Sequence, residues 1–433
     1  MLELNEVNFD FVQTYIDRGF LPNFKTLIER YGFAETTSEA RYEELEPWIQ
    51  WVTAHTGLSL AQHGVCRLGD IMQRDILQIW EHLEANGLVV GAISPMNANN
   101  RLKNPAFFVP DPWTPASTSG GVILKRLSSA VSQAVNDNAQ SRLALSSLLW
   151  LALGALRYAR VDSYPEYFRL AKGARMKPWF KAMFLDLLLS DVFIKESINK
   201  NPEFCSLFLN SSAHIQHHYM FNSSAYRGEM RNPSWYVSEN LDPLLDAYQV
   251  YDKILGEIIR VFPDYRLMIA TGLHQDPYPK LTVYWRLKRH DDFLRKAGVL
   301  FEAVEPRMSR DFLVKCQTPE KALAAEQRLK DIVADDGVPL FDIHNRGCDL
   351  FVMLTYPHEI GDALGFRAGN VHFKSLRNDV AFVAIKNGEH NGIGYFLDTG
   401  NAVPVRERFA LTEIPQRICA ALGVGRMPIC ADK

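Results

Sequence analysis

The chain has 433 residues, of which 47% are hydrophobic and 22% are charged. Its 47 basic and 50 acidic residues give a net charge of 47 − 50 = −3. This composition excludes a disordered, collagenous or coiled-coil protein, and the near-neutral charge disfavours a protein that binds a nucleic-acid polymer. A chain of this length is expected to form two or three domains of roughly 150 residues each.

The first residues and the cysteines predict a cytoplasmic protein. Residues 1–7 contain neither the basic region nor the apolar region of a secretory signal. The six cysteines are scattered without a CxxC pair, which is typical of reduced thiols. The longest uncharged apolar run, over 143–156, has 14 residues, whereas a helix that spans a bilayer needs about 20. We therefore expect no transmembrane segment, and the apolar helices expected at 141–159 and 182–198 leave peripheral membrane contact open.

Strands and helices are expected to alternate in the first third of the chain. Residues 2–7 form the first predicted strand, and a helix over 21–30 starts with Leu-Pro and is followed by a glycine. A second amphipathic helix over 76–86 leads into the apolar run 88–93. A continuous apolar run of this length is typical of a buried parallel strand.

A change of pattern at about residue 120 predicts a helical insertion. Residues 120–200 are dense in leucine, alanine and phenylalanine and poor in strand patterns. The alternation then resumes with a strand over 204–209, a helix over 243–261 and a strand over 266–270.

The block over 290–370 has a β-α-β-β pattern and predicts a small α+β cap subdomain. Its expected elements are strands over 312–315, 341–343 and 349–355 and a helix over 319–333. One more buried strand is expected over 380–385. Segments 1–119, 201–289 and 371–433 would together form a doubly wound α/β sheet, interrupted by the helical insertion and the cap.

Histidines follow three of the predicted strands, at the point where each strand ends. They are His214, His274 and His390. Because strand ends of a doubly wound sheet meet at one edge, we expect these side chains to converge. Imidazole binds zinc, iron or manganese, so a metal site is the alternative to three structural histidines. His218 lies four residues after His214 and would share a face with it in a helix.

Five short motifs occur in the same order as in a known superfamily. They are Pro22-Asn23-Phe24-Lys25-Thr26-Leu27 with Gly32, Thr56-Gly57 through His63-Gly64, Asn210 through His214, Leu273-His274-Gln275, and His390-Asn391-Gly392. In these motifs the chain resembles the alkaline phosphatase superfamily, especially its type I phosphodiesterase/nucleotide pyrophosphatase branch. The resemblance implies an alkaline-phosphatase-like fold and a small-molecule or glycan-type phosphoryl substrate.

The positions that carry chemistry in that family are altered here. Its histidines match His214, His274 and His390, but its metal-binding carboxylates match Asn5, Asn210 and Leu273. Its nucleophile is a threonine or serine, whereas residues 44–51 hold no hydroxyl group and place Glu46 or Pro47 at that position. A covalent mechanism through a threonine cannot operate without the hydroxyl.

The lost carboxylates limit what the site can bind. Two divalent cations about 4 Å apart need anionic ligands to offset their repulsion. We therefore expect at most one metal ion, held by His214, His390 and the amide oxygen of Asn210. The ion would be zinc, manganese or magnesium, and a metal-free site stays open.

Glutamates near the strand ends are candidates to replace the lost groups. Glu46, Glu6 and His274 are the candidate catalytic residues, with Glu46 as a general base or nucleophile. The candidate substrate-binding residues are Asn5, Trp48, Trp51, Asn97 and Arg310. The alternatives are core packing for the tryptophans, loop hydrogen bonding for Asn97 and a surface position for Arg310.

Three functions are compatible with these residues. The first is hydrolysis or transfer on a phosphodiester, nucleotide or sugar nucleotide with a single-metal or metal-free site. The second is glycosyl transfer on the same scaffold, with Glu46 as the acting carboxylate. The third is a non-catalytic relative that binds a ligand or partner.

Overall fold

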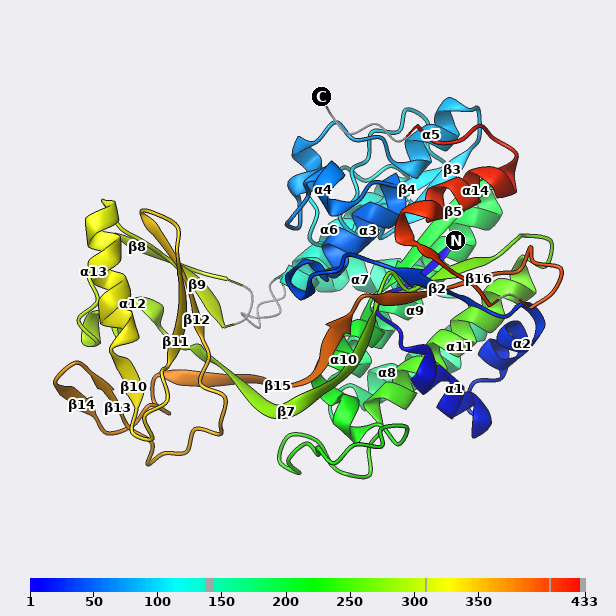
Figure 1. The fold of residues 1–433 in the computed structure, drawn as a ribbon. Helices are drawn as coiled ribbons and strands as arrows, with labels where there is room; N and C mark the ends of the chain where they lie inside the picture. The colour runs from blue at the N-terminus through cyan, green and yellow to red at the C-terminus, as the bar shows by residue number, and fades with distance from the viewer. Residues whose placement is uncertain (137–143, 308–309, 405, 429–433) are drawn as a thin grey trace. The chain divides into compact units, whose positions relative to one another are not determined.

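The computed structural model describes residues 1–136, 144–307, 310–404 and 406–428. The chain divides into two compact units (Figure 1). Unit 1 consists of Met1–Gly228, Val237–Pro277 and Gly388–Lys433, and unit 2 consists of Glu229–Tyr236 and Tyr278–Asn387. The helical segment expected at 120–200 thus lies in unit 1, except for 137–143, which fall outside the described residues; the cap expected at 290–370 lies in unit 2.

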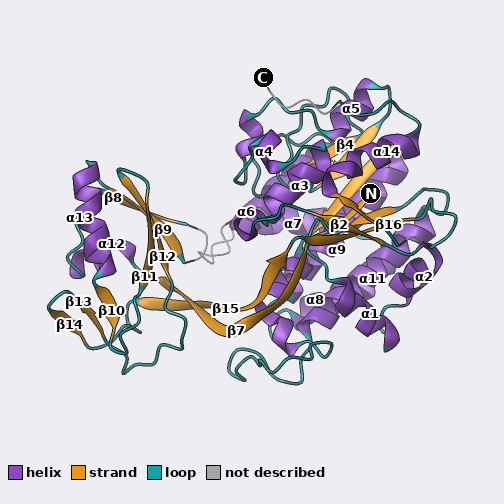
Figure 2. Ribbon diagram, viewed as in Figure 1, coloured by secondary structure: helices purple, strands orange, loops and turns teal. Residues whose placement is uncertain are grey.

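The centre of unit 1 is a mostly parallel sheet (Figure 2). Among the described residues it has eight strands in the order β17-β2-β16-β6-β1-β5-β3-β4. In chain order these are β1 (Leu2–Leu4), β2 (Ala34–Thr37), β3 (Val90–Ile93), β4 (Phe107–Val109), β5 (Phe204–Leu209), β6 (Met268–Ala270), β16 (Ile393–Asp398) and β17 (Arg408–Ala410). Only β16 among them runs antiparallel to both of its neighbours, β2 and β6. The predicted α/β class is confirmed.

Alternate residues of β5 face helices on opposite sides of the sheet, which makes the sheet doubly wound. All six residues of β5 are buried, as its apolar sequence requires. Ser206 accepts a hydrogen bond from Trp80 on one face, and Cys205 receives one from Ser197 on the other. The first face is covered by α3 (Pro47–Thr56), α5 (Ile79–Ala85) and α14 (Ile414–Leu422). The second is covered by α9 (Phe180–Lys200), which packs on β5 and β3.

The remaining helices of unit 1 extend these two layers. They are α1 (Phe9–Asp17), α2 (Pro22–Tyr31), α4 (Leu60–His63), α6 (Val122–Asn136), α7 (Leu145–Tyr158), α8 (Tyr164–Gly173), α10 (Ser211–Tyr219) and α11 (Pro243–Val261). Helix α11 matches its predicted bounds, because Asp242 caps its first turn and Pro243 occupies the first helical position. Helices α6 and α7 pack against each other, and α7 and α8 pack on α9.

Unit 2 has its own apolar core. Its elements are α12 (His290–Lys296), β8 (Ala303–Pro306), β9 (Asp311–Lys315), α13 (Pro319–Lys330), β10 (Ile332–Ala334), β11 (Phe341–Asn345), β12 (Asp349–Leu354), β13 (Phe366–Ala368) and β14 (Val371–Phe373). Strands β11, β12, β9 and β8 form an antiparallel sheet in this order. Long strands β7 (His274–Leu287) and β15 (Val380–Asn391) pair with each other and carry the chain between the units.

Two sequence expectations were wrong in this part of the chain. The strand expected at 380–385 continues to Asn391 as β15 and pairs with β7, while β16 takes the place in the central sheet. The helix expected at 319–333 ends at Lys330, because Ile332–Ala334 pairs with β13 and buries two of its side chains.

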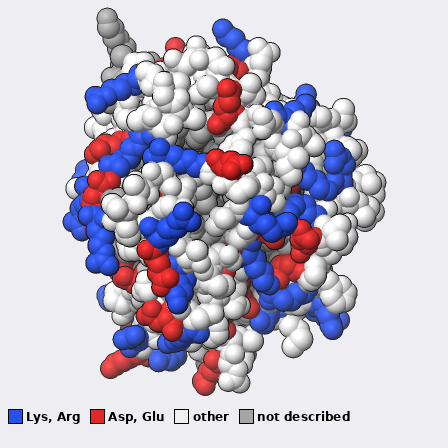
Figure 3. Space-filling model, turned by 90° about the vertical axis from the view of Figure 1, so that its right-hand side faces the viewer, with Lys and Arg blue, Asp and Glu red and all other residues white. Residues whose placement is uncertain are grey.

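The surface carries charges of both signs, in line with the near-neutral net charge of the chain. Basic and acidic side chains lie intermingled on the face drawn in Figure 3. The five cysteines that the structure describes are free thiols, and Cys430 lies outside the described residues. Within the described ranges, every helix is too short or too polar to cross a membrane.

Candidate active site

The site begins where β1 ends, between β5 and β6. The backbone N–H of Asn5 donates to Leu209 at 3.1 Å, and that of Glu6 donates to Thr271 at 3.1 Å. Glu6 has φ +60°, a left-handed conformation that costs a non-glycine residue about 1–3 kcal/mol. This turn places the side chain of Glu6 in the interior, where it is 1% exposed.

Glu6 meets two histidines there. His217 of α10 places its Nε2 3.3 Å from Glu6 Oε2, and His390 of β15 places its Nε2 3.2 Å from the same oxygen. The two Nε2 atoms are 3.2 Å apart. We call Glu6, His217 and His390 the acid–histidine trio.

The three atoms of the trio form a nearly equilateral triangle. A tetrahedral zinc with bonds of about 2.0–2.1 Å separates its ligand atoms by about 3.3–3.4 Å. The triangle therefore has the dimensions of one face of such a coordination shell, with the fourth position left to water or substrate. Two imidazoles and one carboxylate are also a donor set that zinc accepts in catalytic sites. The residues present thus fit a single divalent metal ion.

Hydrogen bonds hold Glu6 in the charged form that a metal ligand needs. Gln275 Nε2 donates to Oε2, and Asn5 Nδ2 donates to Oε1 at 3.1 Å. Gln216 Nε2 binds the backbone carbonyl of Glu6 at 2.7 Å. Burial raises the pKa of Glu6, but His390 and His217 outweigh it and keep that pKa well below its usual range.

Glu46 lies on the other side of His390. It precedes α3 as the N-cap residue, and its Oε2 is 3.9 Å from His390 Nδ1. That distance is an electrostatic contact and is longer than a hydrogen bond. The Glu46 side chain is 35% exposed, so it is accessible to solvent beside the trio.

Asn5, Trp51 and Asn210 support the trio through side-chain hydrogen bonds. Trp51 Nε1 donates to Asn5 Oδ1 at 2.7 Å, and Asn5 Nδ2 donates to Asn210 Oδ1 at 2.7 Å. Trp51 is fully buried. In this arrangement the amide of Asn5 is occupied by Trp51, Asn210 and Glu6, and it fixes the position of the carboxylate.

His214 and His274, predicted to join His390, lie outside the trio. His214 has an exposed side chain on α10, with its ring against that of His218. His274 is buried, with Nδ1 2.5 Å from the carbonyl of Ile393 and Nε2 3.2 Å from Asp276. The hydrogen bond with His274, opposed by burial, lowers the pKa of Asp276.

The other predicted substrate-binding residues have partners of their own. Trp48 is half-buried and donates to the carbonyl of Cys66 at 3.1 Å. Asn97 is buried, and its Nδ2 donates to the carbonyls of Trp48 and Arg67. Arg310 belongs to unit 2, where its guanidinium lies 3.9 Å from the ring centre of Tyr284.

His217 was missed by the sequence analysis, and local spacing gives no signal that selects it over His214. The buried residues of α10 are Ser211, Ser212, Ala213, Ile215 and Gln216, which do not form one stripe of the helix. His217 is partly buried and His214 is exposed because of the way α10 is rotated in the fold.

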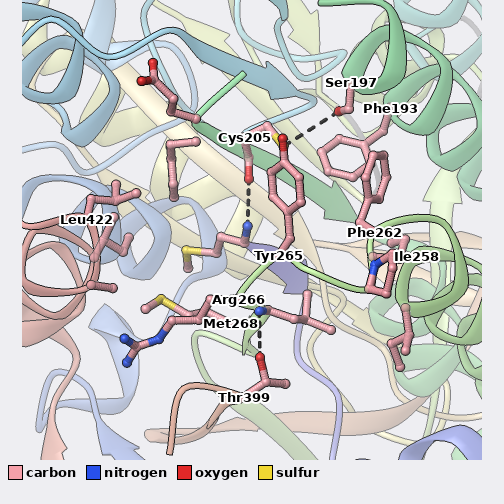
Figure 4. A pocket seen from close by; sticks show the side chains of 18 of the residues that line it. Phe193, Ser197, Cys205, Ile258, Phe262, Tyr265, Arg266, Met268, Thr399 and Leu422 are labelled. Atoms are coloured by element: carbon pink, nitrogen blue, oxygen red, sulfur yellow. Dashed lines mark hydrogen bonds between the residues drawn. The ribbon is translucent and has the colours of Figure 1, made fainter. Parts of the chain in front are cut away.

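An apolar cavity of about 220 Å³ lies at the opposite end of the strands (Figure 4). Its lining includes Cys205 near the start of β5, Met268 at the start of β6, and Phe193, Tyr265 and Leu422. The acid–histidine trio lies beyond the other ends of these two strands. The cavity is therefore separate from the trio.

No family model matches the sequence, and no curated protein matches it. Among solved structures, murine ectonucleotide pyrophosphatase/phosphodiesterase 5 is 11% identical, with 100% of this chain and 96% of that chain covered and a TM-score of 0.46. Its human counterpart is 12% identical over 100% and 96%, with a TM-score of 0.46. Phosphonoacetate hydrolase from Sinorhizobium meliloti 1021 is 11% identical over 97% and 94%, with a TM-score of 0.46.

Proposed function

We propose that this protein is a hydrolase or transferase for a small phosphoryl-linked substrate, such as a phosphodiester, a nucleotide or a sugar nucleotide, and that it uses one divalent metal ion. The observation that carries the proposal is the triangle formed by Glu6 Oε2, His217 Nε2 and His390 Nε2, with sides of 3.2–3.3 Å. The motif order in the sequence supports the phosphoryl substrate class. Zinc fits the two imidazoles best, and manganese is the next candidate.

The proposed ligand set differs from the one expected from the sequence. Glu6 and His217 take the places that the sequence analysis gave to Asn210 and His214. One divalent ion held by this set supplies Lewis-acid stabilisation of the negative charge that develops on a phosphoryl group. A single carboxylate supplies enough anionic charge for one ion.

Glu46 is the proposed general base. Its exposed carboxylate lies beside His390 and can accept a proton from an attacking water molecule or acceptor hydroxyl group. Direct attack by water needs no protein hydroxyl, so the absence of a threonine or serine at this position does not prevent turnover. Glu46 also provides a negative charge close to His390 Nδ1, which favours the tautomer with its proton on Nδ1 and a free Nε2.

Metal analysis of purified variants tests the ligand set. We expect about one equivalent of zinc or manganese in the wild-type protein, and loss of that metal in Glu6→Gln and in His217→Gln. Turnover of phosphodiesters and sugar nucleotides is expected to fall by about 100-fold or more in both variants. The matched control is His214→Gln on the same helix, which should keep both metal and activity. Metal retention in His217→Gln together with loss in His214→Gln would refute this ligand set.

Glycosyl transfer remains a second candidate because of the exposed position of Glu46. If Glu46 acts as a nucleophile on a sugar, it displaces the nucleotide and forms a covalent glycosyl-enzyme that mass spectrometry detects in the wild type, and Glu46→Gln abolishes both the adduct and transfer. If the protein cleaves phosphoryl bonds, both the chelator and Glu46→Gln lower phosphodiester turnover. Binding of ligands without any turnover would point to the non-catalytic alternative.

A further inference from the structure

Helix α7 has its apolar side facing the solvent. Five leucines on this side are exposed, and they recur at spacings of three, one, four and three residues along one stripe of the helix. They are Leu145, Leu148, Leu149, Leu153 and Leu156, and their exposed fractions are 85%, 50%, 58%, 39% and 79%. We call these five residues the leucine stripe.

The polar contacts of α7 are on its inner side. Ser147 donates to Gln133 of α6, and Tyr158 donates to Glu196 of α9 at 3.0 Å. Gly154 lies against Leu127 of α6, where an added Cβ would come within 2.5 Å of the Leu127 side chain. The orientation of α7 is therefore fixed by its neighbours, and the leucine stripe is held outward. An outward apolar stripe of this kind marks an interaction surface.

The net charge of the segment that contains the leucine stripe favours one kind of binding partner over another. Residues 121–181 contain 10 basic and 3 acidic residues, a net charge of 10 − 3 = +7. The rest of the chain contains 47 − 10 = 37 basic and 50 − 3 = 47 acidic residues, a net charge of −10. The basic residues Lys125, Arg126 and Arg157 are exposed on α6 and α7 themselves. The excess of basic over acidic residues thus falls in the segment that exposes the leucines, where Arg160, Arg169 and Lys177 pair with Glu257 and Asp246 from outside it.

We infer that α6 and α7 dock on the surface of an anionic lipid bilayer, with the leucine stripe inserted among the acyl chains and the basic residues at the headgroups. A helix with an apolar face and basic flanks binds an interface in this way. Helix α7 has 14 residues and a length of about 21 Å, less than the roughly 30 Å of a hydrocarbon core, so it would lie along the surface. A second copy of the chain is disfavoured as the occupant, because the exposed Lys125, Arg126 and Arg157 of two copies would repel each other.

Sedimentation of the full-length protein with vesicles tests this inference. We expect binding to vesicles of phosphatidylcholine with phosphatidylglycerol, weaker binding at high salt, and about tenfold weaker binding to phosphatidylcholine alone. The charge-reversal variant Lys125→Glu/Arg126→Glu should also bind anionic vesicles about tenfold more weakly. No binding to anionic vesicles, or equal binding to both kinds of vesicle, would overturn the inference.

Matched serine substitutions separate the stripe from general apolar exposure. The test variant replaces Leu148, Leu149 and Leu156, which are 50%, 58% and 79% exposed, by serine. The control variant replaces Leu300, Leu323 and Val371 of unit 2, which are 77%, 54% and 51% exposed, by serine. Only the test variant should lose vesicle binding, with its thermal unfolding and its turnover unchanged. Loss in both variants or in neither overturns the inference. The inference is also overturned if light scattering shows a wild-type dimer that the test variant abolishes and no vesicle binding is seen.

Discussion

At the scale of single residues, the position of the negative charge is what distinguishes this site. Asn5 stands where a carboxylate was expected, and the next residue, Glu6, supplies one. The left-handed backbone at Glu6 turns its side chain into the interior, where it meets His217 and His390. The charge that is lost at one position is thus present at the neighbouring one, at the cost of backbone strain.

The buried side chain of His63 should make the folded protein less stable in mild acid. Burial, with a smaller contribution from Arg74, lowers the pKa of His63 to about 4. Its Nδ1 accepts a hydrogen bond from the N–H of Val65 at 3.0 Å, and its Nε2 lies 3.2 Å from Thr53 Oγ1, which matches a neutral ring with its proton on Nε2. Because the unfolded histidine has a pKa near 6.5, acid protonates the unfolded state first. The free energy of unfolding should therefore fall from about pH 6.5 down to about pH 4.

Substitution of His63 by asparagine removes this titration. We expect urea unfolding to show an acid-induced loss of stability that is smaller by about 3 kcal/mol in His63→Asn than in the wild type, between pH 7 and pH 4. The control is the same substitution at the exposed histidine His358, made and measured in the same way. The same acid-induced loss in His63→Asn and in the wild type would contradict the assignment.

The residue types at the site could be predicted from the sequence, but their pairing could not. Asn5, Glu6 and Asn210 are at the strand ends where the alternating pattern placed them, whereas His390 lies within β15, which continues past its expected end. The choice between His214 and His217 depends on the rotation of α10 about its own axis. That rotation is set by contacts from distant parts of the chain, such as the hydrogen bond from Gln216 to Glu6.

At the scale of elements, the cap of α1 connects a helix to the site. Asn8 Oδ1 accepts from the N–H of Asp10 at 2.8 Å, and Asn8 Nδ2 donates to the carbonyl of Gln275 at 2.9 Å. Gln275 is the residue whose side chain binds Glu6. The buried Asn8 therefore ends the turn after β1, caps the start of α1 and holds β7, the strand that carries Gln275.

Two substitutions separate these roles of Asn8. Asn8→Ala removes the cap and leaves the buried Gln275 carbonyl without its donor, so we expect a loss of about 2–3 kcal/mol in the free energy of unfolding. Asn8→Ser retains a capping oxygen but does not reach Gln275, and about half of that loss is expected. Denaturant unfolding of the two variants measures the difference. Equal stability of Asn8→Ala and the wild type would show that the cap contributes nothing.

The elements themselves were predictable wherever local pattern and tertiary position agree. Strand β5 and helix α11 have the bounds expected from their apolar runs and caps. The sequence pattern predicts that strand β15 ends at Ile385, because Asn387-Gly388 has the composition of a turn. Pairing with β7 carries the strand through those residues, and this pairing joins segments about 100 residues apart, which no local pattern reveals.

At the scale of the whole molecule, each unit has an apolar core of its own. The buried core cluster of unit 2 lies entirely within residues 283–385. All three members of the acid–histidine trio belong to unit 1. We therefore expect two calorimetric transitions, or a calorimetric enthalpy that exceeds the van't Hoff enthalpy.

A chelator should affect only one of these transitions. Metal present at 100 times its dissociation constant stabilises the folded state by about 2.7 kcal/mol. Its removal should lower the unfolding temperature of unit 1 and leave that of unit 2 unchanged. Glu6→Gln is the control, since its unit 1 transition should not respond to the chelator. A chelator effect on both transitions would contradict the proposed metal site in unit 1.

The position of β1 in the central sheet also has a consequence for biosynthesis. The first strand of the chain is flanked by β5 and β6, and its register partners are Leu207–Leu209 and Ile269–Ala270. Translation at roughly 5–20 residues per second delays the second partner by about 10–50 s after β1 is made. Before β5 is made, the segment Leu2–Leu4 has neither of its two neighbouring strands, and before Thr271 is made the backbone hydrogen bond from Glu6 to Thr271 cannot form. The chemistry-bearing corner of the molecule is thus among the last parts to assemble, because it needs β1, β5, β6 and β15, which lie far apart in the chain.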